Sequence, residues 1–417
     1  MNSGTTLALL SFALLAASCG DDPVSPAEDM PPRTFDVEWK PGVVYFDSTA
    51  LGDIASLDTT NYTYRFMASS SRASSLTAGS VIVVHGQAIR RVTKVTSAGG
   101  AIVVETEDAD LTDAIQNGRI GWNYAASYDE AITPAIMIDG REHAMARVST
   151  GAADYTYKIT IGAHKYELKM KSNGGKIEVN CTIADTASSG VTSEYRMKGT
   201  VEQIRSQSQI DFKDGAITNV DYKNRNVRGT LSVGMSVKGG VKDYGLKLPA
   251  VLLKWPFLVG PIPIVLNVKM EWAVTAQIPL GGKAEVTSTF SFDSETGFSY
   301  DGVDFKAHGV IGPWGATTDT AKSGAVGALA AEFAIGFPQV EVEILAKTFV
   351  AYARPTFLVR GDFSVSGLDG STCQTAKALF AGVAGVRLSA LGIKNLGERQ
   401  IQLWSAEKQL LKEGKCD

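Results

Sequence analysis

Long stretches in which apolar and polar residues alternate are the strongest restriction on the fold of this chain. The longest runs from Leu266 to Ile278, with Leu, Val, Met, Trp, Val, Ala and Ile at every second position. Because successive side chains of an extended chain point to opposite faces, the run predicts a strand about 43 Å long with one apolar face. Alternation at Leu231–Val237 and Val340–Ile344 predicts further strands of this kind. The pattern favours an extended antiparallel sheet with one buried face.

The part of the chain before Gly151 has shorter strand patterns and one helical segment. Arg91–Thr96 and Ala101–Thr106 flank a Ser-Ala-Gly-Gly sequence, whose glycines supply the positive φ angles that a tight hairpin needs. Asp110–Ile115 begins with an acidic residue and is followed closely by Asn-Gly, which predicts one short helix. We therefore predict a small β-rich module with one short helix over residues 35–150.

Strand patterns also dominate residues 151–417. Tyr155–Ile161 and His164–Lys171 flank a Gly-Ala turn and predict a second hairpin. Gln400–Lys412 is the exception, because its Gln, Leu, Lys and Glu residues favour a C-terminal helix. The predicted fold class is mainly β: the small module, then a larger antiparallel β-sheet or sandwich domain that ends in a helix.

The first residues form a separate apolar segment. Leu7–Ala17 is an apolar run of eleven residues, too short to span a bilayer as a helix but suited to the core of a signal peptide. It leads into Ala16-Ala17-Ser18-Cys19-Gly20, in which small residues surround a cysteine. The segment resembles the lipobox of bacterial lipoprotein precursors, and the resemblance covers residues 1–22.

This resemblance implies how the amino terminus is processed. Residues 1–18 would be removed as a signal peptide, and Cys19 would become the lipidated amino terminus, with two or three acyl chains that give stable anchoring. Residues 19–34 would form a disordered linker, because they are acidic, rich in proline and without apolar periodicity. By resemblance to enterobacterial sorting, Gly20 favours the outer membrane over the inner membrane. We therefore expect a bacterial envelope protein whose partner, through acylated Cys19, is the lipid bilayer.

The charge of the chain argues against nucleic acid as a partner. The formal net charge is −4, and residues 1–18 contain none of the charged residues, so the mature part is nearly balanced. The chain therefore has no excess of positive charge that would attract the phosphate groups of a nucleic acid. The partner beyond the membrane is left open, as an unidentified ligand or an envelope protein.

The most apolar part of the mature chain is Ala250–Val265, which contains three prolines. These prolines argue against a continuous helix or a central strand. We expect a buried crossing segment over the end of a sheet. The alternative is an exposed loop in which Trp255 and Phe257 touch a membrane or an apolar ligand.

Three cysteines follow Cys19, and the odd number leaves one unpaired in an oxidising compartment. We predict a disulfide between Cys373 and Cys416, which flank the last strand patterns and would hold the carboxyl terminus. Cys181 lies within a strand pattern and is expected to be a buried small apolar residue. The chain has no CxxC motif, and its four histidines are scattered. We therefore expect neither a metal nor a cofactor.

The sequence carries no recognisable catalytic motif, such as GxSxG or a phosphate-binding glycine loop. The favoured function is a binding or envelope-structural role without catalytic activity. One alternative is a glycan-active hydrolase, which needs two carboxylates in a cleft. A second is a membrane-active, pore-forming-like protein, which needs the Trp255 loop or the segment Lys283–Phe292 to be exposed.

Overall fold

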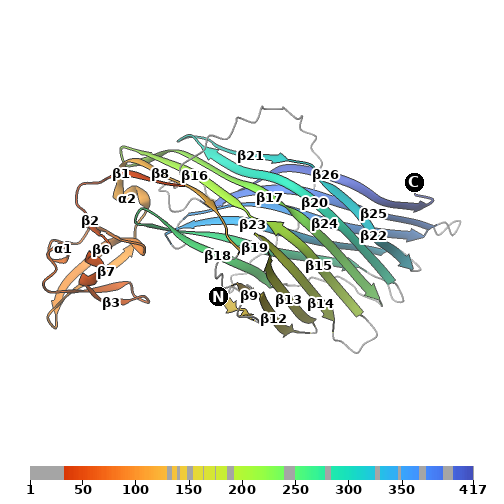
Figure 1. The fold of residues 1–417 in the computed structure, drawn as a ribbon, viewed down its shortest axis with the longest axis horizontal. Helices are drawn as coiled ribbons and strands as arrows, with labels where there is room; N and C mark the ends of the chain where they lie inside the picture. The colour runs from red at the N-terminus through yellow and green to blue at the C-terminus, as the bar shows by residue number, and fades with distance from the viewer. Residues whose placement is uncertain are drawn as a thin grey trace. The chain divides into compact units, whose positions relative to one another are not determined.

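The computed structural model confirms a mainly β fold, built from two large sheets and one small sheet (Figure 1). The structure describes residues 32–128, 134–138, 141–147, 154–162, 164–173, 175–185, 192–238, 249–277, 283–324, 329–345, 349–365, 372–387 and 398–416.

The largest sheet has twelve strands, and nine of them follow the order β1-β8-β16-β17-β15-β14-β13-β12-β11. The first part of the long strand β17 pairs with β16 and its last part with β15. Strand β20 also pairs with β17, and β21 and β22 pair with β20. Their bounds are β1 Arg33–Trp39, β8 Ile115–Ala125, β11 Ala146–Arg147, β12 Asp154–Ile161, β13 His164–Asn173, β14 Lys176–Asp185, β15 Thr192–Glu202, β16 Arg205–Lys213, β17 Ala216–Lys238, β20 Lys283–Tyr300, β21 Phe305–Ile311 and β22 Gly315–Gly324. All pairings in this sheet are antiparallel. The second predicted hairpin is therefore confirmed as β12 and β13.

The second sheet has eight antiparallel strands in the order β10-β9-β18-β19-β23-β24-β25-β26. Their bounds are β9 Ala135–Ile138, β10 Arg141–Ala144, β18 Ala250–Val259, β19 Ile262–Gln277, β23 Leu329–Ile344, β24 Phe349–Val365, β25 Thr372–Arg387 and β26 Glu398–Gly414. The longest alternating stretch of the sequence lies in β19 from Leu266 to Gln277, as predicted, and Ile278 lies outside the described residues.

The small sheet has six strands in the order β2-β5-β6-β7-β4-β3. Its elements are β2 Val43–Phe46, the 3-10 helix η1 Ala50–Asp53, β3 Ile54–Asp58, β4 Thr63–Met67, α1 Ser71–Ser74, β5 Val81–Val84, β6 Ala88–Ala98 and β7 Ala101–Asp108. The predicted hairpin is confirmed as β6 and β7, with positive φ angles at Gly99 and Gly100. The predicted short helix is α2, Leu111–Ala114, with a capping box formed by Asp110 and Asp113.

The strands that precede and follow the small sheet in the sequence, β1 and β8, belong to the largest sheet. They pair with each other, and β8 also pairs with β16. Residues 148–153 lie outside the described part of the chain, so the module boundary near Gly151 stays a prediction.

The inner faces of the two large sheets share one buried apolar cluster. Val268 and Met270 of β19 are each 1% exposed. Aromatic rings join the sheets: the Phe357 ring of β24 has its centroid 5.2 Å from that of Phe290 and 4.9 Å from that of Phe292, both on β20. The segment Lys283–Phe292 is thus part of a core strand and not an exposed hairpin.

The predicted C-terminal helix at Gln400–Lys412 is wrong, because this segment is the end strand β26. It pairs with β25 from Arg387–Glu398 to Cys373–Gly414, with two register shifts along the way. Helix propensity amounts to a few tenths of a kcal/mol per residue, and a continuous ladder with a buried neighbour outweighs it. Within the described residues, no helix is long and apolar enough to cross a membrane.

The proline-rich segment is not a crossing segment but the hairpin of β18 and β19, so that prediction is also wrong. Pro256 pairs with Val265 of β19. On its other side, β9 pairs with β18 only from Ala250 to Leu252 in the described part of the chain. Pro256 therefore lies on an edge of the ladder, where proline is tolerated.

Candidate ligand-binding site between the sheets

Strands β12, β13 and β14 of the twelve-stranded sheet face β9 and β18 of the other large sheet, and β15 lies next to β14. The strand register sets their inward side chains in cross-strand rows two residues apart. The rows, from one end of the strands inward, are Ile161, His164 and Asp185; Ile159, Tyr166, Ile183 and Tyr195; Tyr157, Leu168, Cys181 and Met197; and Tyr155, Met170 and Val179. Rows of one face are about 6.6 Å apart, so the four rows span about 20 Å.

A small hollow lies between these rows and the opposite sheet. Its lining residues are Tyr157, Tyr166, Leu168, Cys181 and Ile183 from the twelve-stranded sheet, with Ile136, Pro249 and Val251 from the eight-stranded sheet. The walls are therefore almost wholly apolar, as is usual for small-molecule sites.

A second small hollow is lined by residues from the next positions along the same strands. Its lining residues are Tyr128, Pro134, Tyr155, Met170, Ser172, Ile177 and Leu253. Tyr155, Met170 and Leu253 each lie two residues from a residue of the first hollow. The two hollows thus follow one another along the strand direction.

Tyr166 is one of two tyrosines that line the first hollow. The side chain is 5% exposed, and its hydroxyl is buried without a hydrogen-bond partner. Burial above all, with Cys181 nearby, raises the pKa of Tyr166 to about 12. The hydroxyl therefore keeps its proton at neutral pH and is a donor that lacks an acceptor.

More polar groups gather in the rows next to Tyr166. His164 is 7% exposed and pairs across strands with Asp185. Burial lowers the pKa of His164, while the Asp185 carboxylate opposes this shift, so the ring favours its neutral form. Burial above all, helped by Asp185 and opposed by Ser193, raises the pKa of Tyr195 to about 12. In the described part of the chain, the row beyond Tyr166 thus holds one carboxylate, that of Asp185.

One side of the site is formed by β12, which lies near an edge of the sheet in the described part of the chain. In the described part of the chain, β11 pairs only with Tyr155 and Thr156 of β12. The remainder of β12 forms the end of the sheet there, and its inward residues Tyr157, Ile159 and Ile161 are half-buried. A strand held on one side moves more readily than a central one.

Cys181 is buried and unpaired, as predicted, and burial raises the pKa of its thiol. It lies in the wall of the first hollow, so it serves there as an apolar lining group.

Trp255 and Phe257 do not form an exposed loop, which corrects the membrane-loop hypothesis. They lie in β18 and are 2% and 7% exposed. The Trp255 indole N–H donates to the Ser127 carbonyl at 2.8 Å, and the Phe257 ring stacks on Tyr124 with centroids 4.3 Å apart. Their parity within β18 directs both rings into the core.

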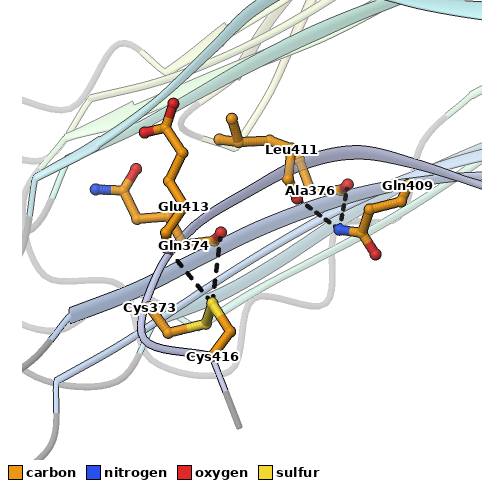
Figure 2. The surroundings of a disulfide bond; sticks show 7 residues. All are labelled: Cys373, Gln374, Ala376, Gln409, Leu411, Glu413 and Cys416. Atoms are coloured by element: carbon orange, nitrogen blue, oxygen red, sulfur yellow. Dashed lines mark hydrogen bonds between the residues drawn. A yellow bond between two sulfur atoms is a disulfide. The ribbon is translucent and has the colours of Figure 1, made fainter.

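A disulfide joins Cys373 to Cys416, the pair expected from the sequence, with Cα atoms 4.9 Å apart (Figure 2). It links the start of β25 to the residue that follows β26 closely. Nearby, the Gln409 amide donates to the carbonyls of Ala376 and Leu411, where the β25–β26 register shifts. The Cys416 sulfur also lies 3.4 Å from the Glu413 carbonyl. This is a packing contact, because a disulfide sulfur has no hydrogen to donate.

Cys19 and the leader lie outside the described residues, so lipidation stays a prediction. Among the residues that the structure does describe, no group of three or more His, Cys, Asp or Glu side chains is placed to hold a metal ion.

Sequence reasoning missed His164, Tyr166, Asp185 and Tyr195 as a group. Each lies in a predicted strand or at its end, and the parity of the strand places it on the inner face. The available signal was a polar or hydroxylated residue at an inward position, but only the register of four strands brings these residues together.

A family model described as a domain of unknown function (DUF8403) matches residues 28–117. The match spans the small sheet, β1, α2 and the start of β8, and it ends before the first residue that lines either hollow. Neither a curated protein nor a solved structure matches the chain.

Proposed function

We propose that this protein is a lipid-anchored protein of the bacterial cell envelope that binds a small apolar ligand between its two large sheets. The binding role depends on one observation: two hollows follow one another along an apolar wall, and Tyr166, whose hydroxyl is buried without a hydrogen-bond partner, lines one of them. A buried polar atom without a partner in the protein requires a water molecule or a bound group to accept or donate its hydrogen bond.

Two features support a place outside the cytoplasm. The apolar leader and Cys19 resemble a lipoprotein signal, and the disulfide between Cys373 and Cys416 is of a kind that persists in oxidising compartments. Stable attachment then requires more than one acyl chain, which the lipoprotein pathway supplies.

The anchor is tested by growing the producing bacterium with a labelled fatty acid. We expect the wild-type protein to carry label and to sediment with membranes, and the Cys19→Ala protein to lose both. The label should fall to background, because no other residue would receive the acyl chains. Cys181→Ala is the matched control and should keep its label. Equal labelling of wild type and Cys19→Ala, or an unlabelled wild type, would contradict the anchor.

The binding role is tested by equilibrium dialysis against tritiated dodecanol. We use the Cys19→Ala protein throughout, because it carries no acyl chain of its own and needs no detergent. Leu168→Trp places a large ring in the first hollow and should weaken binding by about tenfold or more, a loss of at least about 1.4 kcal/mol.

Lys169→Trp is the control for this substitution. Lys169 is the next residue of β13, and its side chain is 57% exposed on the opposite face. It should bind dodecanol as the parent protein does. If Leu168→Trp perturbs folding by circular dichroism, Ile183→Trp fills the same hollow from β14. Undiminished binding by folded Leu168→Trp or Ile183→Trp would place the ligand elsewhere.

A further inference from the structure

An amine, an amide and a carboxylate lie side by side on two neighbouring strands of the eight-stranded sheet. Lys269 of β19 and Gln339 of β23 are direct partners in the antiparallel register, so their Cβ atoms are about 5 Å apart. Glu341 lies two residues beyond Gln339 and therefore on the same face of β23. This is the outer face of the sheet, because the residues at the alternate positions of both strands belong to the buried apolar core.

The carboxylate of Glu341 contacts both of the other groups. Its Oε1 accepts a hydrogen bond from the Gln339 Nε2 at 2.5 Å, and its Oε2 forms an ion pair with the Lys269 Nζ, also at 2.5 Å. Gln339 and Glu341 are only 5% and 4% exposed, although they lie on the outer face. The two oxygens of one buried carboxylate thus hold the amine and the amide nitrogen next to each other.

The oxygen of the same amide has a cationic donor. The Arg354 Nη1 of β24 donates to the Gln339 Oε1 at 3.2 Å. The same Nη1 donates to the Glu271 Oε2 at 2.6 Å, which fixes the position of the guanidinium. A positive charge in this place stabilises the negative charge that develops on the amide oxygen when a nucleophile adds to the amide carbon.

We propose that Lys269 and Gln339 form a covalent amide cross-link that joins β19 to β23. This modification does not depend on the proposed binding function. It requires a nucleophile with an adjacent base, an amide, and a donor at the amide oxygen, and Lys269, Glu341, Gln339 and Arg354 supply these groups.

The reaction needs no cofactor and no oxidant. The Lys269 Nζ forms a bond to the Gln339 Cδ, and the bond between Cδ and Nε2 breaks. The two protons that Nζ loses pass through the Glu341 carboxylate to Nε2, which leaves as ammonium. The carboxylate is then regenerated, so Glu341 acts first as a general base and then as a general acid.

Peptide mass spectrometry tests the cross-link in the protein purified from the producing bacterium. Trypsin does not cleave after an acylated lysine, so we expect residues 255–283 to stay uncut at Lys269 and to be joined to residues 323–347. The branched peptide should be lighter than the sum of its two parts by about 17 Da, the mass of the ammonia lost. Cleavage at Lys269 together with an unmodified peptide 323–347 would overturn the proposal.

Three variants test the roles of the side chains. Lys269→Arg keeps the positive charge but removes the amine, and it should yield no branched peptide. Glu341→Gln keeps the amine and the amide, and it should lower the branched fraction about tenfold or more because the proton carrier is lost. Glu343→Gln is the matched control, since Glu343 is the next acidic residue on this face of β23, and it should branch as wild type does.

Circular dichroism checks that each variant is folded. The wild-type digest decides the cross-link by itself if a variant does not fold. A branched peptide from folded Glu341→Gln in the wild-type amount would overturn the role of Glu341. A loss of about 17 Da that persists in Lys269→Arg would place the reaction elsewhere and overturn the assignment to Lys269.

Discussion

Replacing Cys373 and Cys416 together by serine is expected to lower the free energy of unfolding by about 4 kcal/mol. The disulfide closes a loop with a sequence separation of 43 residues, and in the chain-entropy model a loop of this length restricts the unfolded chain by that amount. The loss should be visible as a lower urea midpoint. It should also make β26 the first strand to be cut by a protease, because β26 is the last strand of its sheet and ends beside this disulfide.

A reductant provides the control for this prediction. It should shift the wild-type urea curve onto that of the double variant and leave the variant unchanged. Cys181→Ala should respond to reductant as wild type does, because Cys181 is not part of a disulfide. Coincident curves for wild type and the double variant under oxidising conditions would show that the bond adds nothing to stability.

The second large effect is expected at the aromatic contact between the sheets. Phe357→Ala should destabilise the protein by about 3–5 kcal/mol, because it leaves a cavity in a region that cannot collapse easily. Phe357 is 0% exposed and touches rings from both sheets, including Phe380 at a centroid distance of 4.9 Å. Denaturant unfolding followed by tryptophan fluorescence measures the loss.

Two substitutions with smaller expected effects serve as controls for Phe357→Ala. Phe357→Leu keeps most of the buried volume and should cost about 1–1.5 kcal/mol. Val310→Ala alters a side chain on β21 that is 48% exposed and should change stability by less than about 0.5 kcal/mol. A similar small loss for Phe357→Ala would mean that the two sheets do not depend on this contact.

The sequence correctly predicted those strands and turns that depend only on residues close together in the chain. Alternation alone predicted β19 and β17, since a period of two requires only that one face of a strand be buried. Gly99 and Gly100 predicted a hairpin because few other residues adopt positive φ angles. Cys181 was predicted to be buried from its place in an alternating stretch.

Predictions failed where a local preference competes with pairing to a distant strand. The residues of β26 favour a helix by themselves, but β25 supplies a ladder along their whole length. Pro256 argues against a strand, yet it lies on an edge where only β19 pairs with it in the described residues. The same pairing directs Trp255 into the core and removes the exposed loop.

Features that depend on neighbouring residues could be predicted from the sequence, whereas features that depend on contacts between distant strands could not. By itself the sequence determined a mainly β chain and its strand faces, because these depend on periodicity and turn residues. It predicted the cysteine pairing from the positions of Cys373 and Cys416 beside the last strand patterns, and the structure shows that pair. Only the tertiary structure decided that Tyr166, Cys181 and Val251 share one hollow, since they come from three strands and two sheets. Which faces pack together is set by burial of the whole core, and no short stretch of the chain contains that information.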